Sequence, residues 1–302
     1  MGAPDLLVLG GRPEGWHGAR LSEALAACGA STARLDFRGL GIAVGGGTGV
    51  RFPGLANLPT AVLVRSIPAG SFEEVTLRLG LLHTLEACGV TVINDARAIE
   101  RCVDKSMTSF LLARAGLPTP PTRVAQSAEE ARAHCAGEAA AGHRTVLKPL
   151  FGAQGRGLRL LDGGDHLPAP EEVAGVYYLQ RFVGRPDRGW QDFRVFVTGG
   201  RAVAAMRRRG RGWITNIGQG GEPEPVVAEG ALAELAVDAA AAVGADHAGV
   251  DLIEDVEGAL HILEINSMPA WQGLQSVTEV DIARELARDV LARVRQRLSF
   301  GH

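Results

Sequence analysis

Two apolar runs near the C-terminus carry acidic and amide side chains in positions that a β-hairpin would bring together. Residues 248–253 and 260–266 are short and mainly apolar, and a charged turn with a glycine separates them, which predicts two strands. Side chains alternate between the faces of a strand, so Glu264 and Asn266 project from the same face. With Asp251 they offer only oxygen ligands, a set that suits Mg²⁺. The alternative is that the carboxylates form salt bridges with arginines, and the hairpin alone favours neither interpretation.

A second segment combines an apolar strand, a lysine and a glycine-rich loop. Strands are predicted at 145–150 and 158–161, with the loop between them. The loop lacks the Gly-Lys-Ser/Thr ending and the following helix of a Walker loop, so it is interpreted as a mobile flap. A plain hairpin is the alternative. Lys148 favours the flap, because a lysine in an apolar strand needs an anionic partner, which a nucleotide phosphate would supply.

Lys105 gives an independent indication of an anion site. Asp104 is a plausible N-cap, and the following helix ends at Gly116 with Pro118 beyond it. A lysine in the first turn opposes the helix dipole, which favours anions there by about 0.3–1 kcal/mol. Lysine together with free backbone donors makes a site for an anion, whereas a solvated surface lysine is the alternative.

The first third of the chain alternates strands and helices. Strands are predicted at 6–9, 31–36, 61–64 and 91–94, and helices at 19–28 and 72–88. This order predicts a parallel sheet with helices on both faces, and Ser71 with Glu74 predicts a capping box for the second helix. Arg65 directly follows the third strand. Ligands of open α/β sheets bind at the carboxyl ends of strands, so Arg65 is a candidate for binding a substrate carboxylate.

The order of these features resembles the ATP-grasp fold, and the resemblance to the RimK-like amide ligases covers nearly the whole chain. The motifs that carry it are residues 94–99 and 104–106, residues 147–149 with 152–157, and residues 179–183, 192–197 and 263–269. Residues 62–74 and 213–221 look like those of the tetrahydromethanopterin glutamate ligases rather than those of the ribosomal-protein glutamate ligases. The chain differs from the latter at Arg181, where they carry a glutamate, and at Ile214, where they carry an arginine.

The resemblance implies an α/β ATP-grasp fold in which two α+β subdomains clasp ATP. The implied parts are an N-terminal parallel α/β domain at 1–95, a lid subdomain with the glycine-rich flap at 96–180, and a C-terminal subdomain with the metal site at 181–302. The residues implied to bind ATP are Lys105, Lys148, Gly152, Gln154, Gly155, Gly157, Gln180, Arg181, Phe182, Val183 and Asp192. Those implied to hold Mg²⁺, or Mn²⁺ in its place, are Asp251, Glu264 and Asn266. Arg208 and Asn216 are implied to be catalytic, and Arg65 and Arg194 to bind substrate.

By the same resemblance the chain is an ATP-dependent carboxylate-amine ligase. ATP phosphorylates a carboxylate on a small-molecule acceptor, and an amine, commonly that of glutamate, then displaces phosphate to form an amide. A tetrahydromethanopterin-like pterin is the expected acceptor. The alternatives are a RimK-like ligase that acts on a protein C-terminus or an amino-acid precursor, and a nucleotide-binding regulator without catalysis. The intact lysine and metal-ligand motifs disfavour the regulator.

Composition agrees with a compact enzyme and excludes some classes of partner. A chain of 302 residues with 46% hydrophobic residues is long and apolar enough for two or three compact units. Its net charge of -3 gives no global attraction to nucleic acid or acidic membranes. No window approaches the ~20 apolar residues that a membrane helix needs, and no signal-like segment begins the chain. We therefore expect a cytoplasmic protein that binds neither nucleic acid nor membrane, and a homo-oligomer is compatible with the sequence.

Overall fold

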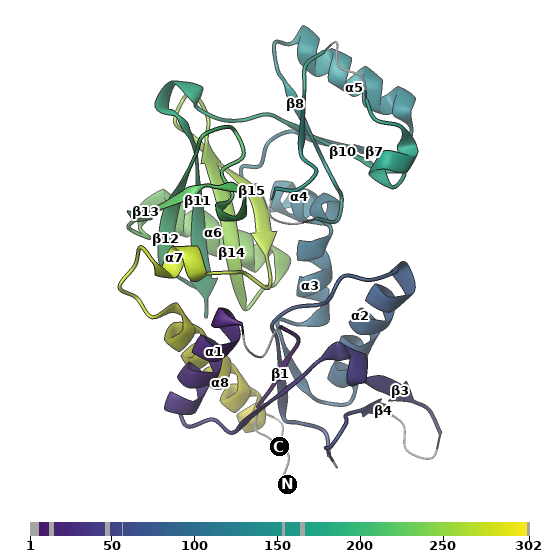
Figure 1. Cartoon of the computed structure of the whole chain (residues 1–302), viewed down its shortest axis with the longest axis vertical. Coiled ribbons are helices and arrows are strands. Elements are labelled where there is room, and N and C mark those ends of the chain that lie inside the picture. Colours follow the sequence, from purple (N-terminus) through teal and green to yellow (C-terminus); the bar gives the residue numbers. More distant parts are fainter. Residues whose placement is uncertain are drawn as a thin grey trace.

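The computed structural model describes residues 6–11, 15–45, 49–55, 57–152, 155–163 and 167–300. The described strands form three sheets of four or five strands and one two-stranded hairpin, and helices cover them (Figure 1). One of the larger sheets is parallel and the other two are antiparallel. This mixed α/β architecture confirms the predicted fold class. The boundaries expected after residues 95 and 180 stay a prediction.

The N-terminal sheet is parallel, with the strand order β2-β1-β5-β6. Its elements are β1 (Leu6–Leu9), α1 (Trp16–Ala27), β2 (Thr32–Leu35), β5 (Ala61–Val64), α2 (Phe72–Ala87) and β6 (Thr91–Ile93), with η1 (Phe37–Gly39) and the hairpin β3 (Gly41–Ala43) and β4 (Gly49–Arg51) between β2 and β5. Every residue of β1 and β5 is buried, as expected for central strands of a parallel sheet that is covered on both faces. The Ser71 hydroxyl accepts from the Glu74 amide and the Glu74 carboxylate accepts from the Ser71 amide, which confirms the capping box.

The central sheet is antiparallel, with the order β7-β10-β8-β9. Its elements are β7 (Thr122–Ala125), α5 (Ala128–Ala140), β8 (Thr145–Lys148), β9 (Arg159–Leu161), η2 (Pro170–Val173) and β10 (Tyr177–Arg181). Helix α5 packs on this sheet, where Ala131, Leu147 and Leu179 share one buried cluster. In Figure 1 the sheet and α5 form the upper right part of the molecule. The glycine-rich loop joins β8 to β9, which confirms the predicted order of strand, loop and strand.

The C-terminal sheet has five antiparallel strands in the order β13-β12-β11-β14-β15. Its strands are β11 (Trp190–Thr198), β12 (Arg201–Gly210), β13 (Glu222–Val226), β14 (His247–Glu254) and β15 (Leu260–Asn266), preceded or separated by the short helices η3 (Pro186–Arg188) and η4 (Ile217–Gln219). Helices α3 (Ala96–Val103), α4 (Lys105–Arg114) and α6 (Gly230–Val243) pack together against it. The Asp104 carboxylate accepts from the Ser106 amide at 2.8 Å, so the predicted N-cap of α4 is confirmed. Lys105 therefore lies in the first turn of a helix beside this sheet.

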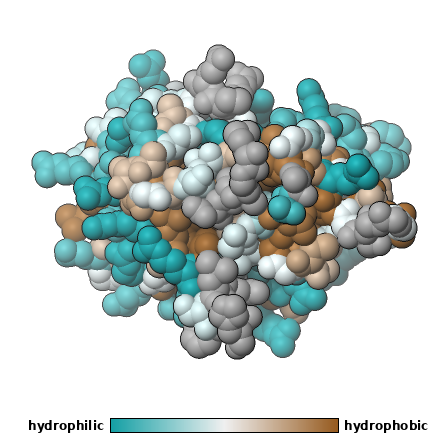
Figure 2. Space-filling model, turned by 90° about the horizontal axis from the view of Figure 1, so that it is seen from below, coloured by the Kyte–Doolittle hydropathy of each residue, from teal (hydrophilic) through white to brown (hydrophobic). Residues whose placement is uncertain are grey.

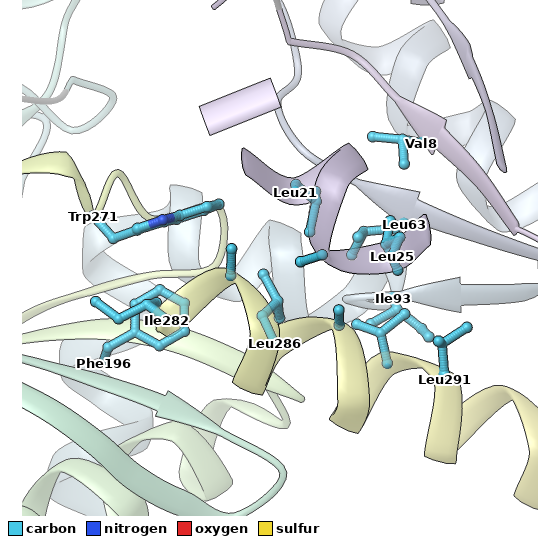
Figure 3. Packing of buried hydrophobic residues seen from close by; sticks show 14 of the residues in the cluster. Val8, Leu21, Leu25, Leu63, Ile93, Phe196, Trp271, Ile282, Leu286 and Leu291 are labelled. Carbon is cyan, nitrogen blue, oxygen red and sulfur yellow. The ribbon is translucent and has the colours of Figure 1, made fainter. Parts of the chain in front are cut away.

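The short helix α7 (Gln272–Gln275) is followed by the last helix, α8 (Ile282–Phe300). Helix α8 packs between the N-terminal sheet and the C-terminal sheet. One buried cluster contains Leu25 of α1, Ile93 of β6, Phe196 of β11 and Leu286 of α8. Figure 3 shows these side chains meeting around α8, which lies between α1 and the C-terminal sheet. The two sheets therefore share a core and hold each other in a fixed relation.

Asn94 connects the same two sheets through hydrogen bonds. It directly follows β6 and is fully buried. Its amide nitrogen donates to the carbonyls of His247 and Ser267 at 2.8 and 2.7 Å, and its amide oxygen accepts from the His247 backbone at 3.1 Å. His247 begins β14 and Ser267 follows β15, so one side chain binds the ends of two strands in the other sheet.

Replacing Asn94 with Ala is expected to lower the free energy of unfolding by about 3 kcal/mol or more, because three buried backbone groups would lose their partner and each costs roughly 1–3 kcal/mol. Urea unfolding monitored by circular dichroism measures the change. Asn57→Ala, at an exposed position, is the matched control and should change stability by less than about 0.5 kcal/mol. Equal stabilities of the two variants would show that Asn94 does not hold the sheets together.

The surface at the end that carries the N-terminal sheet mixes apolar and hydrophilic residues (Figure 2). Exposed apolar side chains of the N-terminal domain include Val44, which follows β3, and Phe72, which begins α2. Within the described part of the chain, every helix is too short or too polar to cross a bilayer.

Candidate active site

A cavity opens between the central sheet and the C-terminal sheet. The predicted site residues that line it are Lys105, Lys148, Gly152, Gly155, Gln180, Arg181, Phe182, Val183, Asp192, Arg208, Asn216, Asp251 and Glu264. Of the remaining predicted residues, Gly157, Asn266, Arg65 and Arg194 lie outside the lining. Gln154 falls outside the described residues. The structure thus brings residues from five predicted motifs to one cavity.

Lys105 and Lys148 are the only lysines in the sequence, and both line the cavity. Every other permanently charged basic residue of the chain is an arginine, so these two positions favour an ammonium group over a guanidinium group. Nζ of Lys148 donates to Oε1 of Gln180 at 2.6 Å, and Nζ of Lys105 donates to the Gly152 carbonyl at 2.8 Å. Both ammonium groups bond to neutral oxygens, which leaves their charge to act on an anion in the cavity.

The ionisation of Lys148 depends on its surroundings. Burial lowers its pKa to about 8, Lys105 lowers it as well, and Glu264 opposes the shift. Burial also lowers the pKa of Lys105. A bound phosphate would raise the pKa of Lys148 again, because an anion favours the charged form. Binding of an anion above about pH 8 therefore takes up a proton.

The affinity for Mg-ATP is expected to be constant below about pH 8 and to fall by up to about tenfold per pH unit above it, because the free protein then loses the Lys148 charge. Isothermal titration calorimetry measures the dissociation constants. Since the chain has two lysines, methyl groups added to them with carbon-13 give one NMR signal from each and report each pKa directly. Titration of Lys148 at its ordinary value of 10.5 would contradict this expectation.

Two arginines and two aspartates form a largely buried network, of which Asp192, Arg208 and Asp251 line the cavity. Arg194 lies opposite Asp251 in the pairing of β11 with β14 and binds both of its carboxylate oxygens at 2.7 Å. Nη2 of Arg208 lies 3.0 Å from Asp251, and its Nε donates to Asp192 at 2.7 Å. Burial works against ionisation of Asp251, but Arg194 and then Arg208 outweigh it and keep the pKa of Asp251 below its usual value. In this structure Asp251 therefore shows the salt-bridged arrangement that was the alternative to a metal ligand.

Glu264 is the cavity carboxylate best placed to hold a divalent cation. It lines the cavity together with Lys148 and Asp251. The carboxylate oxygens of Asp251 already accept hydrogen bonds from arginine, whereas Glu264 has no such partner in the described part of the chain. Asn266, two residues farther along β15, contacts the Gly249 carbonyl through its amide nitrogen at 3.5 Å. No group of three or more acidic, histidine or cysteine side chains suited to a metal occurs among the described residues. One carboxylate with the phosphates fits Mg²⁺, which is usually bound through one or two carboxylates plus substrate phosphates.

Replacing Glu264 with Gln is expected to raise the Mg²⁺ concentration for half-maximal ADP release by about tenfold, because a neutral amide binds the cation less tightly than a carboxylate. Titrating Mg²⁺ at saturating ATP measures this value. Glu257→Gln, in the exposed turn between β14 and β15, is the control and should match the wild type. Unchanged Mg²⁺ dependence in Glu264→Gln would remove Glu264 from the metal site.

Apolar and aromatic side chains also line the cavity. The ring of Phe182 meets Trp213 edge to face at 6.1 Å between centroids, and Arg144 lies over the same ring at 4.6 Å. Such surfaces suit a flat base. Arg181, where the ribosomal-protein ligases carry a glutamate, binds Glu138 of α5 through two hydrogen bonds of 2.7 and 3.0 Å. The arginine at this position is therefore paired with a residue that does not line the cavity.

Several lining residues were not among the predicted site residues. They are Val146, Pro149, Arg156, Leu158, Trp213, Ile214, Thr215, Ile253 and Leu263. Ile253 could have been found, because it lies two residues from Asp251 on the same predicted strand. Leu263 could not have been found from the sequence. The pairing of β14 with β15 shifts in register between Asp251 and Leu252 and leaves Leu263 as a bulge. Leu263 and Glu264, although neighbours in sequence, therefore both face the cavity.

The flap contacts the loop that carries Asn216. Gly155 has a φ of +68°, and a Cβ at this position would lie 2.4 Å from Oδ1 of Asn216 and 2.9 Å from Cγ2 of Ile214. Glycine is therefore required both for the backbone conformation and for the close approach. Gly157 instead lies against Pro149, at the base of the flap. The flap covers one side of the cavity through these contacts.

Comparison with known proteins identifies the family. Residues 102–290 match the model of the RimK-like ATP-grasp domain. The chain is 38% identical to a tetrahydromethanopterin:alpha-L-glutamate ligase of Methanococcus maripaludis over 76% of this chain and 77% of that one, and 36% identical to the Methanosarcina acetivorans protein of the same name over 71% and 74%. The ATP-grasp ligase PsnB, solved with a minimal precursor, Mg and ADP, has the same fold, with a TM-score of 0.71 and 23% identity over 96% of this chain and 98% of that chain. The protein therefore belongs to the RimK-like ATP-grasp family and is an ATP-dependent, amide-bond-forming ligase.

Proposed function

We propose that this ligase joins the amino group of glutamate to a carboxylate of a tetrahydromethanopterin-like pterin. The chemistry is supported by the meeting of Lys105, Lys148, Arg208 and Glu264 at one cavity. The substrates are supported by the relatives at 36–38% identity, which are named for this reaction and align over more than two thirds of both chains. The similarity to these relatives is the observation that carries the choice of glutamate and pterin.

In the proposed first step, the acceptor carboxylate attacks the γ-phosphoryl group of ATP, the bond from the γ-phosphorus to the bridging oxygen breaks, and an acyl phosphate and ADP are formed. Lys148 and Lys105 neutralise the charge of the phosphates, and Arg208, held by Asp192 and Asp251, presents a fixed cation at the cavity. When bound, Mg²⁺ would neutralise further phosphate charge, and Glu264 with the amide oxygen of Asn266 would hold it. Binding of ATP by the cavity is thus proposed to depend on side chains from both sheets.

In the second step, the amine attacks the acyl carbon and phosphate leaves. An acyl phosphate that is open to water would be hydrolysed, so the flap must exclude water while the amine enters. Gly152 and Gly155 place the flap backbone at the cavity, and the contact of Gly155 with Asn216 would hold it closed. Asn216 is therefore proposed to act in closure of the flap.

We further propose that the enzyme is cytoplasmic and acts on small molecules rather than on nucleic acid or membranes, as its charge and composition predict. Use of Mn²⁺ in place of Mg²⁺ and assembly into a homo-oligomer remain part of the proposal. The division into an N-terminal domain, a lid with the flap and a C-terminal subdomain with the metal site is proposed as the sequence predicts it.

The proposal is tested by ADP release from the purified protein with ATP, Mg²⁺, glutamate and a tetrahydromethanopterin-type acceptor, followed by mass spectrometry. The expected product is the acceptor heavier by one glutamyl unit. A protein C-terminus and an amino-acid precursor are the competing acceptors in the same assay. Product from either of these, with none from the pterin, would overturn the proposed acceptor and keep the ligase, whereas nucleotide binding without ADP release for any acceptor would favour a regulator.

A further inference from the structure

Arg34 and Arg65 lie close together near the carboxyl end of the N-terminal sheet. Arg34 lies in β2 and Arg65 directly follows β5, and these two strands flank β1. A Cβ added to Gly11 would lie 3.1 Å from Cγ of Arg65 and 3.6 Å from Nη2 of Arg34, so both side chains border the same glycine. Gly11 follows β1 with a φ of +81°, and its lack of a side chain allows both arginines to approach it this closely.

Part of each guanidinium group lacks a partner among the described residues. Arg34 donates through Nη1 to the Gly18 carbonyl at 2.8 Å and the Ser22 hydroxyl at 3.3 Å, and Arg65 donates through Nη1 to the Met268 carbonyl at 3.2 Å. Nε and Nη2 of Arg34 and Nε of Arg65 are buried without a hydrogen-bond partner in the described part of the chain. Burial lowers the pKa of Arg65 to about 10, and the charge of Arg34 lowers it as well. An anion beside both groups would satisfy the donors and relieve the repulsion.

The described surroundings fix Arg65 and add no further charge. The Trp271 ring lies 4.9 Å from the guanidinium carbon of Arg65 and is almost fully buried, so it supports the arginine and is closed to a stacking ligand. Figure 3 shows Trp271 within the shared core between α1 and the C-terminal sheet. Nε2 of His17 accepts from the backbone amides of Trp271 and Gln272 at 3.0 and 3.3 Å, which requires the neutral ring. Among the described residues, the positive charge of the cluster is therefore that of Arg34 and Arg65.

The two arginines lie near the ATP cavity without lining it. Arg65 contacts Met268, which is four residues beyond Glu264 along the chain, a span of about 13 Å at most in extended backbone. A carboxylate that receives the phosphoryl group must lie inside the cavity with the phosphates. A carboxylate held by Arg34 and Arg65 is therefore one that does not react.

We propose that Arg34 and Arg65 bind a non-reacting carboxylate of the amino acid that supplies the amine. The inference deepens the proposed function and depends on it for the identity of that amino acid. Glutamate reacts through its amine alone and keeps both carboxylates throughout, so an enzyme that selects it needs cations outside the phosphate site. A second carboxylate on the acceptor is the other source of the same chemistry, and the kinetic experiment separates the two.

Binding is tested with glutarate, a dicarboxylate that lacks the amine, by calorimetry on the full-length protein loaded with Mg-ADP. Arg34→Gln and Arg65→Gln are each expected to weaken glutarate binding by about tenfold or more, whereas Arg38→Gln, at an exposed position of the same domain, leaves it unchanged. Arg65→Lys keeps the charge and serves where the glutamine variant fails to fold. No measurable binding to the wild type, or equal binding by the variants, would overturn the site.

Steady-state kinetics identify the source of the carboxylate. The inference predicts that KM for glutamate rises by about tenfold in both variants, while KM for the acceptor and for ATP changes by less than about twofold. A rise in KM for the acceptor alone would overturn the assignment to the amino acid. If glutarate binding depends on both arginines but the wild type releases no ADP with glutamate, the proposed substrate fails and the carboxylate site stands.

Discussion

Replacing Lys148 with Met is expected to weaken Mg-ATP binding by about a hundredfold, which corresponds to about 2.7 kcal/mol. Methionine has a similar length and an apolar end, so the variant removes the charge while filling the same space. The side chain lies at the end of β8, bonds to Gln180 and contributes one of the two ammonium groups at the cavity. Isothermal titration with a non-hydrolysable ATP analogue measures the loss.

Two controls separate the phosphate contact from a general defect. Thermal unfolding of the Lys148→Met protein without nucleotide should give a midpoint no lower than that of the wild type, because burial already disfavours the charged lysine. Lys148→Arg keeps a cation but changes its shape, so it should retain part of the affinity. A folded Lys148→Met protein that binds the analogue as tightly as the wild type does would show that the lysine does not bind phosphate.

Replacing Arg208 with Leu is expected to lower the free energy of unfolding by about 4 kcal/mol and to abolish ADP release. Arg208 is buried and binds Asp192 and Asp251 at once. Its removal leaves Asp192 as a buried carboxylate without its charged partner, and breaking a buried pair in this way costs about 3–5 kcal/mol. Burial already raises the pKa of Asp192, and Arg208 is the main group that opposes the rise.

Paired variants identify the cause of this loss. The double variant Arg208→Leu with Asp192→Leu removes both charges together and should recover at least about half of the lost stability, while ADP release stays absent. Arg209→Leu, at the next position, breaks a half-exposed pair with Glu224 and should cost less than about 1 kcal/mol. A cost below about 1 kcal/mol for Arg208→Leu as well would mean that the network does not stabilise the cavity lining.

Local patterns in the sequence were sufficient to predict most of the elements. The capping box of Ser71 and Glu74, the N-cap Asp104 and the buried strand β5 each depend on residues that are near in sequence, so periodicity and capping rules apply directly. The gathering of Lys105 and Lys148 at one cavity followed only from the resemblance to a family. No local rule brings together two residues that lie 43 positions apart.

Features that depend on strand register were beyond the sequence analysis. Arg194 binds Asp251 because β11 and β14 pair with these two residues directly opposite each other, and the bulge at Leu263 changes which side chains face the cavity. The hydrogen bonds of Asn94 with His247 and Ser267 join segments about half the chain apart. Oxygen ligands could be recognised from their residue types, but their competition for arginines could be seen only in three dimensions.

The transfer of oxygen from the acceptor carboxylate to phosphate tests the central claim most directly. The acceptor is labelled with oxygen-18 in its reacting carboxylate and converted by the enzyme with ATP, Mg²⁺ and glutamate, and the inorganic phosphate is analysed by mass spectrometry. An acyl phosphate requires that each phosphate released with product carries one labelled oxygen, since the carboxylate oxygen that attacked phosphorus leaves with it. Unlabelled phosphate formed together with amide product would contradict the acyl-phosphate mechanism for this protein.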